Sequence, residues 1–249
     1  GGLSMNVLVL VEHAAGAVKD ATLSAVTAAR ALGTVHALVA GNGAEAQGAA
    51  NAAAQIDGVE KVLLASSANV YGNQGGEAIA ETVCPKPVNH YAMSKLAMEH
   101  MAATYAGQLP LVMTRPFNYT GVGHDLRFVI PKIVDHYKRQ ASRIELGNLD
   151  VYREYNDVRQ VCDVYLKLLQ CGVAGETYNV CSGRAVSLRE VLDLMTEITG
   201  WQPEVHVNPA FVRANEIHTL AGDCSKLEKV IGAQKSFDLV ETLTWMINA

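Results

Sequence analysis

Short apolar runs alternate with longer amphipathic stretches along the first two thirds of the chain. The runs are strand-sized and rich in valine and leucine, as the strands of a parallel sheet are when helices cover both of its faces. We therefore expect strands at residues 6–11, 35–40, 59–65, 109–114 and 177–180. Apolar strands that alternate with helices are typical of an α/β fold with a doubly wound parallel sheet.

Helix signals lie between these strands. Asp20 can cap a helix that runs to Leu32, and a second helix is expected over residues 44–56. A third is expected over residues 89–105. Its periodicity predicts a buried stripe made of Met93, Leu96, Ala97 and Met101.

The C-terminal third has a different pattern, with shorter strands and separate helices. The expected strands are at residues 143–147 and 152–155, and the expected helices are near residues 158–171, 188–199 and 238–247. This change predicts a small C-terminal subdomain.

Composition and charge favour small-molecule chemistry. The 249 residues are 49% hydrophobic, which is enough to bury a large core. The net charge of -5 and the lack of a basic run argue against nucleic acid or an anionic membrane as a partner. The five cysteines are scattered and never at CxxC spacing, so we expect neither a disulfide framework nor a zinc site, and a reducing cytoplasm fits.

Tyr91 and Lys95 lie four positions apart on the third expected helix, so both side chains project from one face. A nearby ammonium group favours the phenolate and lowers the phenol pKa from about 10 towards neutrality, as a general acid or base requires. Ser67 could orient a substrate carbonyl by hydrogen bonding. A tyrosine and a lysine at this spacing also occur on ordinary amphipathic helices, so the pair alone leaves both interpretations open.

The surrounding motifs change that balance. They are residues 66–72 (SSANVYG), 91–95 (YAMSK), 115–118 (RPFN), 147–150 (GNLD), 153–158 (REYNDV) and 178–183 (YNVCSG). Together they resemble the extended short-chain dehydrogenase/reductase family over about residues 62–249, and most of all its GDP-4-keto-6-deoxy-mannose reductases and GDP-mannose dehydratases. This resemblance implies a Rossmann-like fold, an NAD(P) cofactor and a GDP-linked nucleotide sugar as substrate. It also implies that the subdomain, mainly residues 124–160 and 184–235, binds the substrate.

The resemblance also implies roles for individual residues. Ser67 would be the catalytic hydroxyl, Tyr91 the acid or base, and Lys95 both its tuner and a ribose ligand. The implied cofactor contacts are Ser66, Tyr91, Lys95, Pro116 and Phe117, and the implied substrate contacts are Asn118, Arg153 and Arg213. Guanidinium groups suit a nucleotide diphosphate, although a surface ion pair is an alternative for each arginine.

One departure narrows the implied reaction. Dehydratases of this family carry a carboxylate two positions before the tyrosine of the YG pair, and Asn69 stands at that position here. An amide cannot do the same proton work. The motifs therefore favour reduction or epimerisation over dehydration.

The usual dinucleotide cradle is missing from the sequence. A strand, a GxxGxxG turn and a helix N-terminus should open the fold, because only glycine lets the backbone approach the pyrophosphate. Residues 12–20 (EHAAGAVKD) follow the first strand instead and contain one glycine, while Glu12 and Asp20 add negative charge. The second strand ends at residues 40–42 (AGN), without an acid for an adenosine ribose.

Residues 5–65 resemble a different protein family. The matching segments are residues 6–13 (NVLVLVEH), 19–23 (KDATL), 28–33 (AARALG), 39–41 (VAG) and 56–65 (IDGVEKVLLA). They resemble the N-terminal part of the electron transfer flavoprotein alpha subunit, which is a βαβαβ unit. The flavin site of that subunit lies mainly in its other domain, so no flavin is expected here.

We therefore hypothesise an engineered or selected chimera that joins residues 5–65 to residues 66–249, with residues 1–4 (GGLS) as an expression scar. Two functions stay open: a folded chimera with weak or absent activity, and an active NAD(P)-dependent oxidoreductase. We expect the strand that leads to Ser67 to lie beside the first strand. The helices around the catalytic pair could join two copies in a homodimer.

Overall fold

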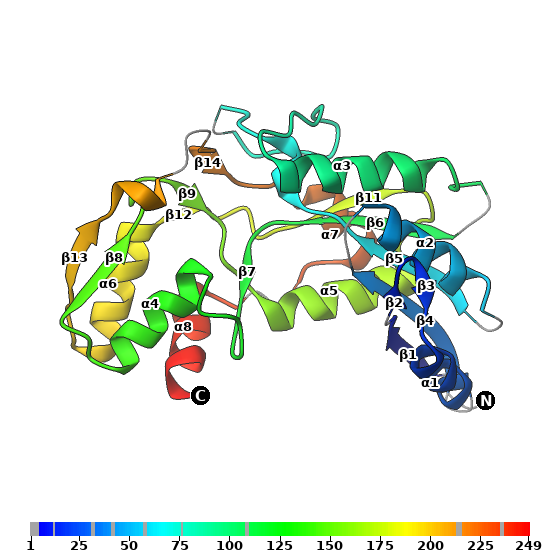
Figure 1. Ribbon diagram of the computed structural model, residues 1–249, viewed down its shortest axis with the longest axis horizontal. Coiled ribbons are helices and arrows are strands. Elements are labelled where there is room, and N and C mark those ends of the chain that lie inside the picture. Colours follow the sequence, from blue (N-terminus) through cyan, green and yellow to red (C-terminus); the bar gives the residue numbers. More distant parts are fainter. Residues whose placement is uncertain are drawn as a thin grey trace.

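The protein has two connected lobes, seen side by side in Figure 1. The structure, a computed structural model, describes residues 5–11, 13–30, 33–40, 43–56, 59–75, 77–107, 110–212, 216–234 and 237–249. The lobe on the right of the figure contains a central parallel sheet, and the lobe on the left surrounds a separate hydrophobic cluster.

Five parallel strands make the central sheet, in the order β1-β4-β5-β6-β11. Their bounds are Met5–Leu10 (β1), Gly33–Ala40 (β4), Val59–Ala65 (β5), Leu111–Pro116 (β6) and Thr177–Val180 (β11). These strands confirm the five expected from the apolar runs, and the α/β Rossmann-like class is confirmed with them. Every residue of β6 is buried, including the polar Thr114 and Arg115 near its end.

Helices cover both faces of this sheet. On one face lie α2 (Gly43–Ala54) and α3 (His90–Ala103), and on the other lie α5 (Val158–Cys171) and α7 (Ser225–Ile231). Side chains alternate along β5 accordingly: Val62 and Leu64 pack towards α2 and α3, and Leu63 packs towards α5 and α7. The remaining helix of this lobe among the described residues, α1 (Asp20–Arg30), packs against β1 and β4.

The position of β5 differs from our expectation. We expected β5, which leads to Ser67, to lie beside the first strand, and this prediction is wrong. β4 pairs with β1 on one side and with β5 on the other, and β5 pairs in turn with β6. The connection from β4 to β5 contains the single helix α2, and such a short crossover places consecutive strands side by side, whereas the connection from β5 to β6 contains both η1 and α3.

A hairpin follows β1, where a dinucleotide-binding fold would place a glycine-rich turn and a helix. It consists of β2 (His13–Ala14) and β3 (Ala17–Val18), with positive φ angles of 50° at Ala15 and 78° at Gly16. The hairpin packs against α2. A Cβ atom at Gly48 of α2 would stand 2.9 Å from the carbonyl oxygen of Gly16, so the two glycines allow the two backbones to approach closely.

The second lobe is built from helices and short strands. Its cluster combines α4 (Val129–Lys138), α6 (Leu188–Thr199) and α8 (Leu239–Asn248) with β8 (Arg143–Leu146), which pairs in parallel with β13 (Glu204–Val207). The shorter elements are β7 (Tyr119–Thr120), β9 (Tyr152–Arg153), β10 (Asn156–Asp157), β12 (Val186–Ser187), β14 (Thr219–Leu220) and the 3-10 helices η1 (Ala68–Tyr71) and η2 (Pro209–Phe211).

Three findings concern cysteines, metal ligands and membranes. All five cysteines are free thiols. In the part of the chain that the structure describes, no three histidine, cysteine or carboxylate side chains gather as metal ligands. Across the same part, no helix has both the length and the apolar content needed to span a bilayer.

Candidate active site

The motif segments meet where the central strands end. Ser66 and Ser67 directly follow β5, β6 ends at Pro116, and β11 ends at Val180. Because the three strands are parallel, their carboxyl ends lie at one edge of the sheet. In open α/β sheets this edge is the usual place for a ligand.

Ser67 caps the short helix η1. Its Oγ accepts hydrogen bonds from the backbone N–H of Asn69 at 3.2 Å and from the side-chain amide of Asn69 at 3.1 Å. Neither bond uses the hydroxyl proton of Ser67, which can therefore be donated to a substrate oxygen. The neighbouring hydroxyl of Ser66 is buried and has no hydrogen-bond partner within the protein.

Helix α3 presents Tyr91 and Lys95 on one face. Asn89 starts the helix, because its side-chain oxygen accepts the backbone N–H of Ala92 at 2.8 Å. Tyr91 is 47% exposed, whereas Lys95 is only 6% exposed. The Lys95 Nζ lies 6.0 Å from the centre of the Tyr91 ring and donates to the carbonyl oxygen of Ala65 at 2.9 Å.

Burial is the main influence on the charge of Lys95. It lowers the pKa of the ammonium group below its ordinary value of 10.5, and the nearby negative charge of Glu99 opposes this effect. Lys95 therefore lies close to the exposed phenol of Tyr91. Its burial makes the charged ammonium form less favourable than it would be in water.

The rotation of α3 is not the one expected from its apolar residues. Met93 and Met101 are 51% and 40% exposed, Ala97 is exposed, and Leu96 is only partly buried, so the predicted stripe is wrong. The buried residues are Ala92, Lys95, Met98, Glu99 and Ala102. Two charged side chains are thus turned towards the sheet, because each finds a polar partner there.

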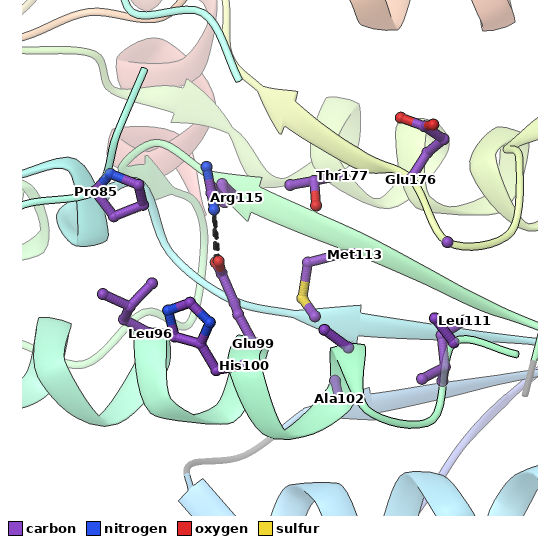
Figure 2. Close-up of a pocket in the computed structure, with 13 residues that line it drawn as sticks. Pro85, Leu96, Glu99, His100, Ala102, Leu111, Met113, Arg115, Glu176 and Thr177 are labelled. Atoms are coloured by element: carbon purple, nitrogen blue, oxygen red, sulfur yellow. Dashed lines mark hydrogen bonds and ion pairs between the residues drawn. The ribbon is translucent and has the colours of Figure 1, made fainter. Parts of the chain in front are cut away.

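A buried polar network connects three of the motif segments to Glu99 of α3. Arg115 of β6 binds Glu99 of α3 through two hydrogen bonds, from Nε at 2.9 Å and from Nη2 at 2.6 Å. A dashed line marks the contact of this pair in Figure 2. The Nη1 of Arg115 donates to the hydroxyl of Tyr71 at 3.0 Å, and that hydroxyl donates to Oδ1 of Asn179 in β11 at 2.7 Å. Tyr71 and Asn179 are fully buried.

The pKa shifts in this network determine which of its groups are charged. Burial acts to lower the pKa of Arg115, but the hydrogen bonds and charge of Glu99 raise it overall. Burial raises the pKa of Tyr71, and Arg115 only partly offsets this. Arg115 is therefore a cation and Tyr71 a neutral phenol. The motifs contain Tyr71, Arg115 and Asn179 but do not predict this network, since nothing in their spacing links positions that are far apart in the sequence.

A second set of residues was expected to meet the cofactor and the substrate. Phe117 is almost fully buried, and its backbone N–H donates to the carbonyl oxygen of Val180 at 2.9 Å. Pro116 is buried at the end of β6. Asn118 is partly exposed, and its carbonyl oxygen accepts two hydrogen bonds from Asn156. Phe117 thus belongs to the core beside the site, while Asn118 reaches its rim.

The structure describes only one of the two arginines that we expected to bind a diphosphate. The guanidinium group of Arg153 donates to the backbone carbonyl oxygens of Tyr152, Ile217 and His218. It therefore links β9 to the segment that precedes β14. Arg213 lies outside the described residues.

Glu154 is a buried carboxylate whose role the sequence did not predict. Its Oε1 accepts the backbone N–H of Gly222 at 2.7 Å, and its Oε2 accepts the backbone N–H and the hydroxyl of Ser182 and the side-chain amide of Asn156. These bonds join the loop after β11 to the segments around β9 and β14, at the junction of the two lobes. Only its position next to Arg153 in a motif could have pointed to it.

A cavity of about 250 Å³ lies between α3 and the strands β6 and β11 (Figure 2). Leu96 and Met113 line it, and so do both members of the Glu99–Arg115 pair. None of the three expected catalytic residues lines this cavity.

The described residues fit only one end of an NAD(P) cofactor. Lys95 and the unpartnered hydroxyl of Ser66 offer polar groups for the nicotinamide and its ribose. The pyrophosphate end does not fit. After β1 the chain forms the β2–β3 hairpin, so in the described part of the chain no helix N-terminus directly follows β1 to offer its backbone N–H groups to the phosphates.

Comparison with known proteins places the chain in a family. A family model described as GDP-mannose 4,6 dehydratase matches residues 25–246. GDP-6-deoxy-D-talose 4-dehydrogenase of Aggregatibacter actinomycetemcomitans is 38% identical over 182 residues, which are 73% of this chain and 62% of that enzyme. The chain therefore spans less than two thirds of the length of this relative.

Solved structures agree with this assignment. A candidate epimerase from Burkholderia cenocepacia has 45% identity and a TM-score of 0.82, with 92% of this chain and 78% of that chain covered. RMD from Pseudomonas aeruginosa in complex with NADPH has 31% identity and a TM-score of 0.73, with 81% and 69% covered.

A shorter match concerns the second resemblance. An electron transfer flavoprotein alpha subunit of Cryptococcus neoformans, described as probable, is 42% identical over 88 residues, which are 33% of this chain and 25% of that protein. The family model, in contrast, covers most of the chain and begins within the segment 5–65 that we assigned to the flavoprotein. The chain belongs to the GDP-mannose 4,6 dehydratase family.

Proposed function

We propose that the chain is a chimeric Rossmann-like protein whose larger part derives from an NAD(P)-dependent nucleotide-sugar reductase or epimerase, with weak cofactor binding and weak or absent activity. Residues 5–65 would come from a flavoprotein-alpha-like unit and residues 66–249 from the enzyme. The short match to a flavoprotein alpha subunit supports this origin for part of the chain.

The retained chemistry supports the enzymatic origin. Tyr91 is exposed near the carboxyl edge of the sheet, where it can give or take a proton, and the Lys95 Nζ lies 6.0 Å from the centre of its ring. Ser67 can donate its hydroxyl proton to the oxygen of a keto sugar or alcohol. A bound nicotinamide would supply or accept the hydride.

The hairpin after β1 is the observation that carries the proposal of weak cofactor binding. A pyrophosphate group in a dinucleotide fold depends on backbone N–H groups at a helix N-terminus. Charge-assisted hydrogen bonds of this kind contribute roughly 1.5–3 kcal/mol each. Here β2 and β3 stand directly after β1, so several such bonds are not available at that position.

The substrate side follows from the relatives. We propose a GDP-linked keto-deoxy sugar, because one relative is a dehydrogenase of a GDP-linked deoxy sugar. Asn118, Arg153 and Arg213, with the subdomain over residues 124–160 and 184–235, would bind it. Asn69 favours reduction or epimerisation, since its amide binds Ser67 and cannot act as the acid of a dehydration. We propose no flavin.

An active NAD(P)-dependent oxidoreductase is the second candidate. It is favoured by the buried position of Lys95 beside Tyr91, which a site without selection for activity would have no reason to keep. In that case the segments around β4 and α2 would have to supply new contacts for the cofactor.

Cofactor titration separates the two candidates. We would titrate the protein with NADPH and NADH, follow intrinsic fluorescence and thermal shift, and assay reduction of a GDP-4-keto-6-deoxy sugar. The chimera with weak binding predicts a cooperative thermal transition that millimolar cofactor does not shift. Tight binding, with turnover that Tyr91→Phe abolishes, would overturn it and establish the active oxidoreductase.

A further inference from the structure

We propose that Glu99 is a positioning residue of this site: its ion pair with Arg115 sets the rotation of α3 that carries Tyr91 and Lys95 to the carboxyl edge of the sheet. The inference rests on the proposed function for its chemical meaning, since it concerns how the same catalytic groups are placed. Its structural part can be tested without substrate or cofactor.

The pair is strong and closely defined in geometry. Both side chains are at least nine-tenths buried, and the guanidinium group meets both carboxylate oxygens, at 2.9 Å and 2.6 Å. A bidentate contact of this kind constrains direction as well as distance. Since Arg115 is on β6 and Glu99 is on α3, the contact ties the helix to one strand in one orientation (Figure 2).

Helix geometry carries this constraint to the catalytic groups. Residues 91, 95 and 99 are spaced by four, so Tyr91, Lys95 and Glu99 lie along one face of α3. A rotation of α3 that moved Glu99 away from Arg115 would also move Lys95 away from the carbonyl oxygen of Ala65, which its Nζ contacts at 2.9 Å.

The apolar residues of α3 do not by themselves select this rotation. Met93, Ala97 and Met101 follow one another along a different face, whereas Ala92, Met98 and Ala102 lie on the buried one, so both faces offer apolar side chains to the sheet. The buried face also contains Lys95 and Glu99, so polar contacts contribute to the choice between the two faces.

The partners of Arg115 place its guanidinium group relative to the strands that carry the site. Its Nη1 donates to the Tyr71 hydroxyl at 3.0 Å, and Tyr71 donates to Asn179 of β11 at 2.7 Å. Tyr71 ends η1, the helix that Ser67 caps. The same network therefore relates α3 to the segment of Ser67 as well as to β6.

A merely stabilising ion pair is the competing explanation. Both explanations predict that loss of the pair changes stability and that loss of the Glu99 charge lowers the Lys95 pKa. Only positioning predicts that the neutral Lys95 amine also becomes more accessible, and a pH series separates this accessibility from the pKa. We would replace the pair in two ways, as Glu99→Gln and as the double variant Glu99→Met with Arg115→Met. Apolar replacement of a buried ion pair is often neutral for stability, so the double variant should fold even if the single one does not.

The readout is the reactivity of Lys95 towards trace acetic anhydride across a pH series, measured by mass spectrometry. Leu168→Ala is the control: Leu168 is fully buried on α5, on the opposite face of the sheet, so this variant loses stability without touching the pair. Exposed Lys138 serves as the internal reference in every sample.

We expect the pH-independent rate at which the neutral Lys95 amine is acylated, relative to Lys138, to rise about tenfold in both pair variants and to stay unchanged in Leu168→Ala, a factor equivalent to ~1.4 kcal/mol. The proposal is overturned if Lys95 stays as protected in the pair variants as in the parent protein, or if Leu168→Ala exposes it equally. Because the labelling needs no turnover, an inactive chain still decides the question. In an active chain, kcat should fall in the pair variants while KM changes little.

Discussion

Lys95 carries its ammonium group to the sheet side of α3, where it donates to the carbonyl oxygen of Ala65. Burial lowers its pKa, which means that the folded protein disfavours the charged form relative to the unfolded chain. A residue that is kept buried and charged at a cost in stability is typical of a functional position. The Lys95 charge beside Tyr91 has a function only if Tyr91 donates or accepts a proton in a reaction.

Lys95→Met should raise the free energy of unfolding by roughly 1 kcal/mol at neutral pH, because methionine fits the same space without a charge. The folded-state pKa of Lys95 is depressed, so the parent protein is penalised while Lys95 is protonated, and the penalty fades as the pH rises from the folded pKa towards the ordinary value of 10.5. The difference between parent and variant should therefore narrow with rising pH, as urea denaturation can measure. Exposed Lys138→Met is the control. A difference that widens with pH would contradict the assigned direction.

Single residues of the site were predictable to different degrees. Ser67, Tyr91 and Lys95 lie in motifs whose spacing is local, and the structure has them at or next to the same edge of the sheet. The partnership of Glu99 with Arg115 was not predicted, because the two residues are 16 positions apart on different elements and the packing of α3 against β6 brings them together. Arg153 could be named from its motif, but not its bonds to three backbone carbonyl oxygens.

At the scale of elements, the β2–β3 hairpin and α2 form one packed unit. The hairpin turns at Gly16, and Gly48 of α2 lies against that turn. An alanine at a helix interior is usually about 1 kcal/mol more favourable than glycine. At Gly48 this gain competes with the close backbone contact to Gly16.

Gly48→Ala should destabilise the protein by roughly 1–2 kcal/mol, because overpacking outweighs the gain in helix propensity. The new Cβ would stand 2.9 Å from the carbonyl oxygen and 3.0 Å from the Cα of Gly16, and backbone atoms cannot yield as a flexible side chain can. Urea denaturation measures the change. Gly107→Ala, in the turn after α3, is the control for an added Cβ atom without overpacking, since that atom would meet nothing within 4 Å. An increase in stability for Gly48→Ala would show that the hairpin does not pack there.

The sequence predicted the bounds of helix α3 but not the face that it buries. Its location was predicted well, as residues 89–105 against His90–Ala103, because capping and periodicity are local properties. Its buried face was predicted wrongly. Amphipathic patterning ranks faces by apolar content, whereas the structure buries Lys95 and Glu99, whose partners lie on other elements.

At the scale of the whole molecule, the central sheet is continuous across the proposed junction. β5 ends at Ala65, close to the boundary between residues 5–65 and 66–249, and pairs with β4 on one side and β6 on the other. Parts from two sources can share a sheet if strand length and covering helices match, because the ladder of backbone hydrogen bonds does not depend on side chains.

The exposed face of α3 leads to a prediction about assembly. We propose a homodimer that covers Met93 and Met101, which are exposed on the same face with Ala97 between them. Size-exclusion chromatography with light scattering should then show a dimer for the parent protein and a monomer for the double variant Met93→Gln with Met101→Gln. Leu166→Gln, an exposed leucine on α5, should leave the mass unchanged. An identical mass for the parent protein and the double variant would contradict this interface.

The sequence by itself determined the strands, most helix bounds, the Tyr91–Lys95 spacing and the missing glycine-rich turn, since all of these depend on neighbours within a few positions. Tertiary structure alone decided the order of β1, β4 and β5, the rotation of α3 and the network from Glu99 to Asn179. The physical reason is that a buried polar group selects its partner by where the fold places it: Tyr71 and Asn179 are 108 positions apart, yet their side chains are 2.7 Å apart.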